Sequence, residues 1–117
     1  MTDQEIQPNT LDEPITRGTD NVFADLGFVD AVEHQTKLRL ALAINSLLTR
    51  EGLSQVKAAE RLGVNQPKVS ALAAYKLGGF SVERLMTFLT ALDQDVSITI
   101  RKKPRHQAGG KITVKAA

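Results

Sequence analysis

The stretch that most constrains the fold is residues 53–80, LSQVKAAERLGVNQPKVSALAAYKLGGF, which has the pattern of two short helices joined by a tight turn. Ser54 and Asn65 each precede a run with helical periodicity, where their side-chain oxygens can accept a helix N–H. Gly63 falls where the first helix must end in a left-handed conformation, which glycine adopts at low cost. Pro67 lies in the first turn of the second helix, where its missing N–H does no harm.

Two helices joined by a three-residue turn with a glycine form the helix-turn-helix layout, whose second helix can enter the major groove of DNA. The same spacing occurs in ordinary αα-corners of small helical proteins, and this alternative remains open. On the outward side of the second helix, Gln66 could pair with adenine and Lys68 could donate to guanine. These two side chains are therefore the predicted base-edge contacts.

Other polar residues around the motif are predicted to contact the DNA backbone. The start of the first helix favours anions, because its N–H groups are not paired within the helix. Asn65 and Ser70 could reach phosphates or base edges, Lys76 could reach phosphates, and Ala71 could touch a thymine methyl group. Lys57 and Arg61 add diffuse positive charge. The predicted DNA-binding set is Ser54, Gln55, Asn65, Gln66, Lys68, Ser70, Ala71 and Lys76.

Helical patterns also flank the motif. Residues 30–51 contain neither Gly nor Pro and predict one long helix that begins at Asp30 and ends at Gly52. A short ordered segment over residues 22–28 precedes it, with a turn at Gly27. A further helix is expected after Ser81. The sequence therefore predicts an all-α bundle of about five helices.

A change of period near the C-terminus predicts a β-strand. Val96, Ile98 and Ile100 alternate with polar residues, which is typical of a strand with one buried face. A lone strand needs a partner for its backbone groups. Residues 111–115, KITVK, also alternate and could close a hairpin within the chain; alternatively, the strand pairs with its copy in a second subunit.

Charge is distributed unevenly along the chain. Residues 1–36 hold eight acidic residues against one arginine, whereas residues 37–117 hold fourteen Lys and Arg against five acidic residues. Basic surface favours nucleic acid through counterion release at phosphates. We expect residues 1–20 to form a disordered acidic arm, residues 21–101 the helix-turn-helix domain with its strand, and residues 102–117 a flexible basic tail.

Several classes of function are not expected. The chain has no cysteine, and its two histidines, His34 and His106, lie in a polar helix start and a loose tail. No metal-binding, phosphate-loop or catalytic pattern is present, so we expect no enzyme activity, no cofactor, no metal and no small-molecule ligand. The sequence has no run of eighteen apolar residues and its acidic N-terminus is unlike a secretion signal, which predicts a cytoplasmic protein without membrane contact.

Several separated motifs resemble a known family. LSQVKAAERLGVNQPKVSAL is similar to the helix-turn-helix of the XRE (lambda-repressor-like) family. NVFADLGF at residues 21–28 and GFSVERLM at residues 79–86, followed by DVSITI, resemble the small HigA-type antitoxins. The resemblance implies a lambda-repressor-like fold, a Gln55 that clamps the DNA backbone, and a homodimer that pairs its C-terminal strands. It also implies a repressor of its own operon that binds a small basic toxin.

The resemblance leaves two alternatives, a stand-alone XRE-type regulator and a protein-interaction module that has lost DNA binding. The chain departs from the family pattern at ALAAYKL, residues 71–77, where relatives usually have larger or basic residues and a glycine. Fewer guanidinium contacts suggest weaker or narrower DNA binding. Tyr75 in place of glycine leaves the end of the second helix undefined.

Overall fold

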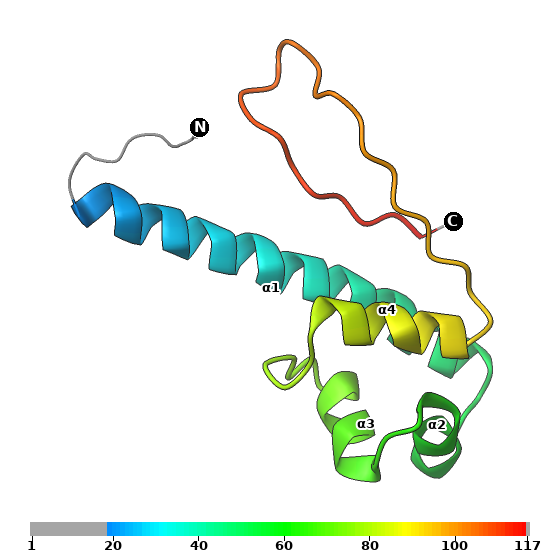
Figure 1. The fold of residues 1–117 in the computed structure, drawn as a ribbon. Helices are drawn as coiled ribbons and strands as arrows, with labels where there is room; N and C mark the ends of the chain where they lie inside the picture. The colour runs from blue at the N-terminus through cyan, green and yellow to red at the C-terminus, as the bar shows by residue number, and fades with distance from the viewer. Residues whose placement is uncertain (1–18, 117) are drawn as a thin grey trace. The chain divides into compact units, whose positions relative to one another are not determined.

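A computed structural model describes residues 19–116 of the 117-residue chain. Most of the predicted acidic arm, residues 1–18, lies outside the described residues. The chain divides into two compact units, residues 1–33 and residues 34–117, and the helix-turn-helix belongs to the second. The helices of the described part are α1 (Thr19–Arg50), α2 (Gln55–Leu62), α3 (Gln66–Ala73) and α4 (Val82–Ala91) (Figure 1).

The start of α1 differs from the prediction. The helix begins at Thr19, continues through Gly27 and Asp30, and therefore replaces the expected short segment, turn and helix. The predicted turn at Gly27 and the predicted N-cap at Asp30 are wrong. A single glycine inside a helix costs only about 1 kcal/mol relative to alanine, which does not force a break. The sequence predicts about five helices, and residues 19–116 contain four.

The ends of the shorter helices follow the predicted capping chemistry. Ser54 Oγ accepts the N–H of Lys57 at 3.2 Å, and the Ser81 hydroxyl accepts the N–H of Arg84 at 3.0 Å. Each serine thereby satisfies one of the unpaired donors in the first turn of its helix. Gly52 ends α1 with a φ of 65°, in the left-handed region where glycine is favoured.

One aliphatic core joins α2, α3, α4 and the C-terminal part of α1. Fifteen side chains form it: Leu40, Ala41, Ile44, Leu48, Ala58, Ala59, Leu62, Val69, Leu72, Leu77, Phe80, Leu85, Phe88, Leu89 and Leu92. Phe80 and Phe88 meet edge to face, with ring centroids 5.9 Å apart. Met86 packs against this core as a partly buried side chain, as expected of a flexible apolar residue. The core thus supports both helices of the predicted motif from beneath.

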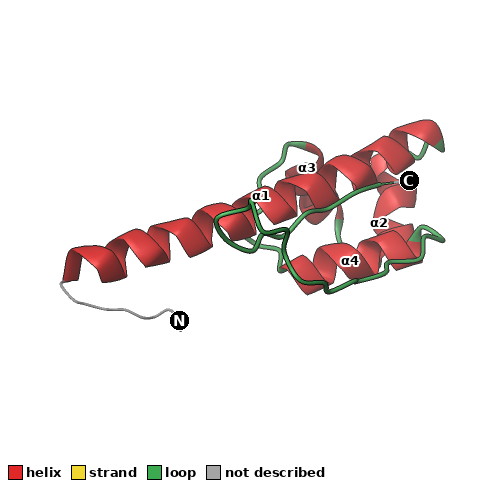
Figure 2. Ribbon diagram, turned by 90° about the horizontal axis from the view of Figure 1, so that it is seen from above, coloured by secondary structure: helices red, strands yellow, loops and turns green. Residues whose placement is uncertain are grey.

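The C-terminal segment contains no strand. Within residues 19–116 the backbone outside the helices forms turns and irregular loops, and residues 94–104 are extended without ladder pairing (Figure 2). The all-α class is confirmed, but the strand predicted at Val96, Ile98 and Ile100 does not form in this single chain. Residues 111–115 do not supply the partner either, so the intrachain hairpin is wrong. The physical reason is that extended backbone becomes a strand only when another strand pairs with it.

The predicted basic tail is partly described. Residues 102–116 form neither helix nor strand, and Val114 alone among them packs against the core as a half-buried apolar side chain. None of the helices in residues 19–116 combines the length and apolar character needed to span a lipid bilayer.

Candidate nucleic-acid interface

The turn between α2 and α3 has the geometry that the sequence predicts. Gly63 adopts a φ of 72° and donates its N–H to the Ala59 carbonyl at 2.9 Å, which closes the end of α2. Val64 donates to the same carbonyl at 3.0 Å and packs against the core. Asn65 then caps α3, with its side-chain oxygen 3.0 Å from the N–H of Lys68. The three residues fix α3 relative to α2 within one short connection.

One side of α3 faces the core and the other faces solvent. Val69 and Leu72 are buried on the inner side, whereas Gln66 and Ser70, four positions apart, are exposed on one outer stripe. Ala71 is half-buried at the edge of this stripe. The structure therefore brings the predicted base-contacting side of α3 to the surface, where Gln66 is accessible.

The predicted backbone contacts are also at the surface. Ser54, Gln55, Asn65 and Lys76 are exposed. The oxygens of Ser54 and Asn65 already accept helix N–H groups, so Asn65 has only its amide N–H groups left to donate to a phosphate. Gln55, the first residue of α2, keeps both its amide donors and a helix N-terminus beside it.

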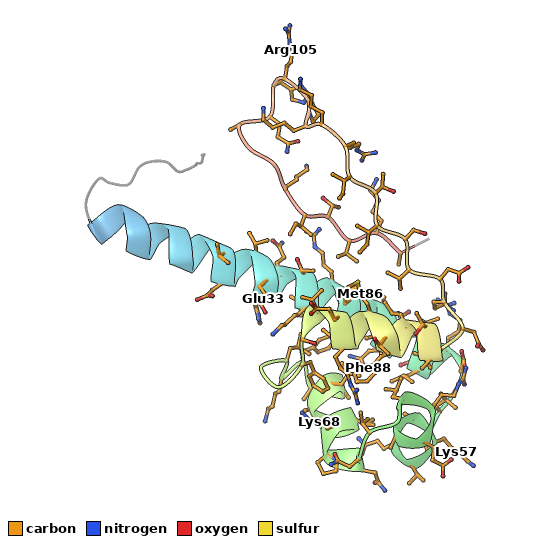
Figure 3. The ribbon with its side chains drawn as sticks, viewed as in Figure 1. Glu33, Lys57, Lys68, Met86, Phe88 and Arg105 are labelled. Atoms are coloured by element: carbon orange, nitrogen blue, oxygen red, sulfur yellow. The ribbon has the colours of Figure 1, made fainter. Side chains whose placement is uncertain are left out.

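The sequence predicts Lys68 on the outward side of α3, but its side chain contacts the connection that follows α3. Lys68 is a residue of α3 (Figure 3). Its ammonium donates to the Gly79 carbonyl at 3.2 Å and lies 4.9 Å from the centroid of the Phe80 ring. Both partners belong to the connection between α3 and α4. The side chain remains exposed, but the structure gives its ammonium a defined position against this connection.

Asn45 has a structural role that the sequence pattern does not predict. Its amide Nδ2 donates to the Leu72 carbonyl at 3.0 Å. That carbonyl lies in the last turn of α3, where it also accepts the N–H of Tyr75 at 3.1 Å. Asparagine beside a core isoleucine in a helix interior is a weak signal for such a role, because Asn has low helix propensity. Asn45 thus ties α1 to the C-terminal end of α3.

Arg61 is likewise a structural residue and not a source of diffuse charge. Its guanidinium donates to the Ala91 carbonyl at the end of α4 at 3.2 Å. It also pairs with Glu51 at 3.1 Å and with Asp93 at 3.2 Å. One side chain of α2 therefore contacts the ends of α1 and α4. No local pattern could reveal this, because the three partners are distant in sequence.

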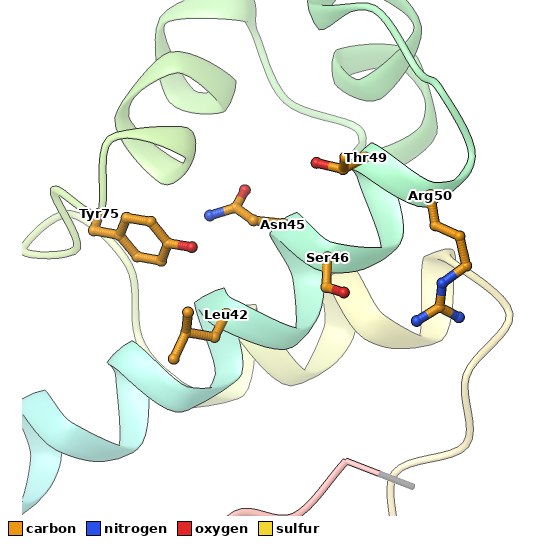
Figure 4. A pocket seen from close by; sticks show the side chains of 6 residues that line it. All are labelled: Leu42, Asn45, Ser46, Thr49, Arg50 and Tyr75. Atoms are coloured by element: carbon orange, nitrogen blue, oxygen red, sulfur yellow. The ribbon is translucent and has the colours of Figure 1, made fainter.

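Tyr75 defines the end of α3. It takes a φ of 58°, and its N–H donates to the Leu72 carbonyl while the next N–H, of Lys76, donates to the Ala71 carbonyl. Tyrosine thus occupies the left-handed position that glycine usually takes. Its ring faces a shallow, open depression on α1, which is lined by Leu42, Asn45, Ser46, Thr49, Arg50 and Tyr75 (Figure 4).

The charged groups near the motif are mostly exposed. Lys57 on α2 pairs only loosely with Glu60, at 3.8 Å, and both side chains are about two-thirds exposed to solvent. Among the side chains that the structure describes, His, Asp and Glu do not form a group of three that could hold a metal ion. The arrangement presents hydrogen-bonding and cationic groups on a rigid helical support.

Comparisons with known proteins agree with this geometry. A family model described as a helix-turn-helix domain matches residues 22–101. A solved structure named "Putative XRE Family Transcriptional Regulator" is 68% identical in sequence, with a TM-score of 0.74, over 75% of this chain and 99% of that one. No curated protein matches the sequence significantly. The chain belongs to the XRE family of helix-turn-helix transcriptional regulators, which act by binding DNA and not as enzymes.

Proposed function

We propose that this regulator is a sequence-specific repressor that binds its operator as a homodimer, and that it is the antitoxin of a toxin–antitoxin pair. The observation that carries the repressor role is the outer side of α3. Gln66 and Ser70 are accessible there, while Val69 and Leu72 anchor the helix in the core. A helix held this rigidly can present polar groups to base edges in the major groove.

Each predicted contact has a place in this proposal. Gln66 and Lys68 read bases and Ala71 contacts a thymine methyl group. The backbone contacts come from the starts of the two helices, from Ser70 within α3 and from the chain after α3. These positioning residues are Ser54, Gln55, Asn65, Ser70 and Lys76.

Two substitutions test base reading against phosphate contact. We expect Gln66→Ala to remove discrimination at one base pair, worth about 1–3 kcal/mol. Lys76→Ala should weaken binding to all sequences alike. Titrations of duplex DNA at several salt concentrations measure both, because phosphate contacts make affinity fall steeply with salt. Binding that is absent at every salt concentration would instead favour a protein-interaction module, and an equal loss on all sequences for Gln66→Ala would contradict base reading.

The C-terminal segment supports the dimer. Ile98 and Ile100 are 74% and 92% exposed, and Val96, which precedes them in the same alternating pattern, is 37% exposed. Aliphatic side chains and unpaired extended backbone together suit an antiparallel pairing with the same segment of a second copy. Replacing Ile98 with Pro removes a ladder donor, so we expect monomers in sedimentation experiments. An unchanged dimer would reject this mode of pairing.

The antitoxin role rests on the resemblance of the sequence motifs and on charge. Residues 1–36 hold eight acidic residues against one arginine, which suits a basic partner. The test uses the product of the neighbouring reading frame, purified with this chain. A small basic protein that binds with salt-sensitive affinity, and more weakly after removal of residues 1–18, supports the proposal. The lack of any such complex would favour a stand-alone regulator.

A further inference from the structure

The contacts of Lys68 give the connection after α3 a second role. The Lys68 ammonium lies against two groups of residues 78–80, the Gly79 carbonyl at 3.2 Å and the Phe80 ring at 4.9 Å. Phe80 is buried and packs edge to face on Phe88 of α4, so the ring is a fixed part of the core. A carbonyl and an aromatic face on a fixed loop together hold a cation in a defined place.

We propose that residues 78–80 form a platform that sets the direction and reach of Lys68, and that Gly79 is a specificity-determining position because it leaves room for the ammonium. The inference deepens the proposed function, since it assumes that Lys68 reads a base. Gly79 itself does not contact the base; it acts through Lys68 and is a positioning residue.

The physical gain is preorganisation. A free lysine side chain loses rotamer entropy when it is fixed, and in the free protein the platform already accounts for part of this loss before DNA binds. The ammonium has three donors, of which the Gly79 carbonyl accepts one. Two donors remain for guanine acceptors. The platform therefore orients the Lys68 side chain and leaves two of its N–H donors free to bind a base.

The two adjacent glycines provide a matched pair of variants. A Cβ at Gly79 would lie 3.2 Å from the Lys68 Nζ, whereas a Cβ at Gly78 would meet nothing within 4 Å. Neither glycine has a positive φ, so alanine fits the backbone at both positions. Because the end of a lysine chain moves easily, Gly79→Ala should displace the ammonium and leave the fold intact. Gly78→Ala is the control.

The first experiment tests the platform without DNA. The Phe80 ring should shift the Lys68 Cε–Hε resonances upfield in NMR spectra of the free protein, whereas those of Lys57 should stay at ordinary values. We expect Gly79→Ala to move the Lys68 resonances toward those of Lys57, and Gly78→Ala to leave them unchanged. Ordinary Lys68 resonances in the unmodified protein would overturn the proposal.

The second experiment tests specificity. The probe is a duplex that the unmodified protein selects from a random library, together with its single-base-pair variants. We expect Lys68→Ala to lose about fivefold or more discrimination at one base pair. Gly79→Ala should lose discrimination at that same base pair, and it should add nothing when combined with Lys68→Ala.

Two outcomes would overturn the inference while leaving the proposed function intact. Gly79→Ala could bind every duplex as Gly78→Ala does, or its effect could persist in the Lys68→Ala background, which would show that it does not act through Lys68. If the unmodified protein selects no sequence at all, the proposed function fails together with base reading by Lys68. The NMR result then still decides whether the platform exists.

Discussion

Apolar side chains are mostly buried in the helical core and mostly exposed in the C-terminal segment. In residues 38–92 aliphatic side chains from all four helices meet in one core, with Leu42 and Val56 as exposed exceptions. Polar side chains such as Asn45 and Arg61 connect the helix ends. In residues 93–116 Ile98, Ile100 and Ile112 face solvent, and Val114 alone packs against the core. A single chain thus buries most apolar side chains of residues 38–92 but leaves those of residues 93–116 exposed to solvent. Residues 38–92 are therefore stabilised within one chain, whereas residues 93–116 leave apolar side chains exposed that the proposed dimer would bury.

Truncating one side chain in each region should give the largest difference in protein stability between the two regions. Leu72 is 1% exposed and Ile100 is 92% exposed. We expect Leu72→Ala to lower the free energy of unfolding by about 2–5 kcal/mol, because it leaves a cavity beneath α3. Ile100→Ala should change the stability of the dilute, monomeric protein by less than about 0.5 kcal/mol. Urea unfolding measures both, and similar losses would mean that residues 93–116 belong to the core.

Removing the hydrogen bond between α1 and α3 should have a smaller effect than the truncation of Leu72. Asn45→Ala removes one of two hydrogen bonds to the Leu72 carbonyl, which still accepts the Tyr75 N–H at 3.1 Å. We expect a cost of about 0.5–1.5 kcal/mol, offset by up to about 0.7 kcal/mol from the better helix propensity of alanine. Thermal unfolding measures the loss. Ser46→Ala, an exposed neighbour on α1, is the control and should be nearly neutral. Equal behaviour of the two variants would show that Asn45 does not hold α3.

Arg61 tests whether polar contacts at the helix ends matter. Arg61→Ala removes three hydrogen bonds, and we expect a loss of about 1 kcal/mol, because Asp93 and Glu51 are solvated and only the Ala91 carbonyl is partly buried. High salt should shrink only the ion-pair share of this loss. Lys57→Ala on the same helix removes an exposed pair and should change little. A loss for Lys57→Ala as large as that for Arg61→Ala would point to net charge instead of these contacts.

The smallest effect is expected at the end of α3. Tyr75 has a φ of 58°, which costs a non-glycine residue about 1–2 kcal/mol. Tyr75→Gly relieves this strain but adds about 0.5–1 kcal/mol of backbone entropy to the unfolded chain. We expect a net stabilisation of less than about 1 kcal/mol, measured as a small rise in Tm. A clear fall in Tm would mean that the contact of the ring with α1 outweighs the backbone strain.

Much of the motif was predictable because its signals are local. Ser54, Asn65 and Ser81 are N-caps, and Gly63 turns left-handed between the helices, as their positions before and after periodic runs indicate. The buried side of α3 also follows from helical spacing. The predicted start of α1 was wrong. A single glycine raises the free energy of a helix by too little to decide between a helix and a turn.

The sequence by itself determined the helix-turn-helix, because each cap and turn depends on residues within about four positions of one another. Only the tertiary structure decided which polar side chains hold that motif in place. Asn45, Arg61 and Lys68 meet carbonyls that are 27, 30 and 11 positions away. Such partners are set by the folding of the whole core, which brings distant helix ends together and leaves the extended C-terminal segment without a strand to pair with.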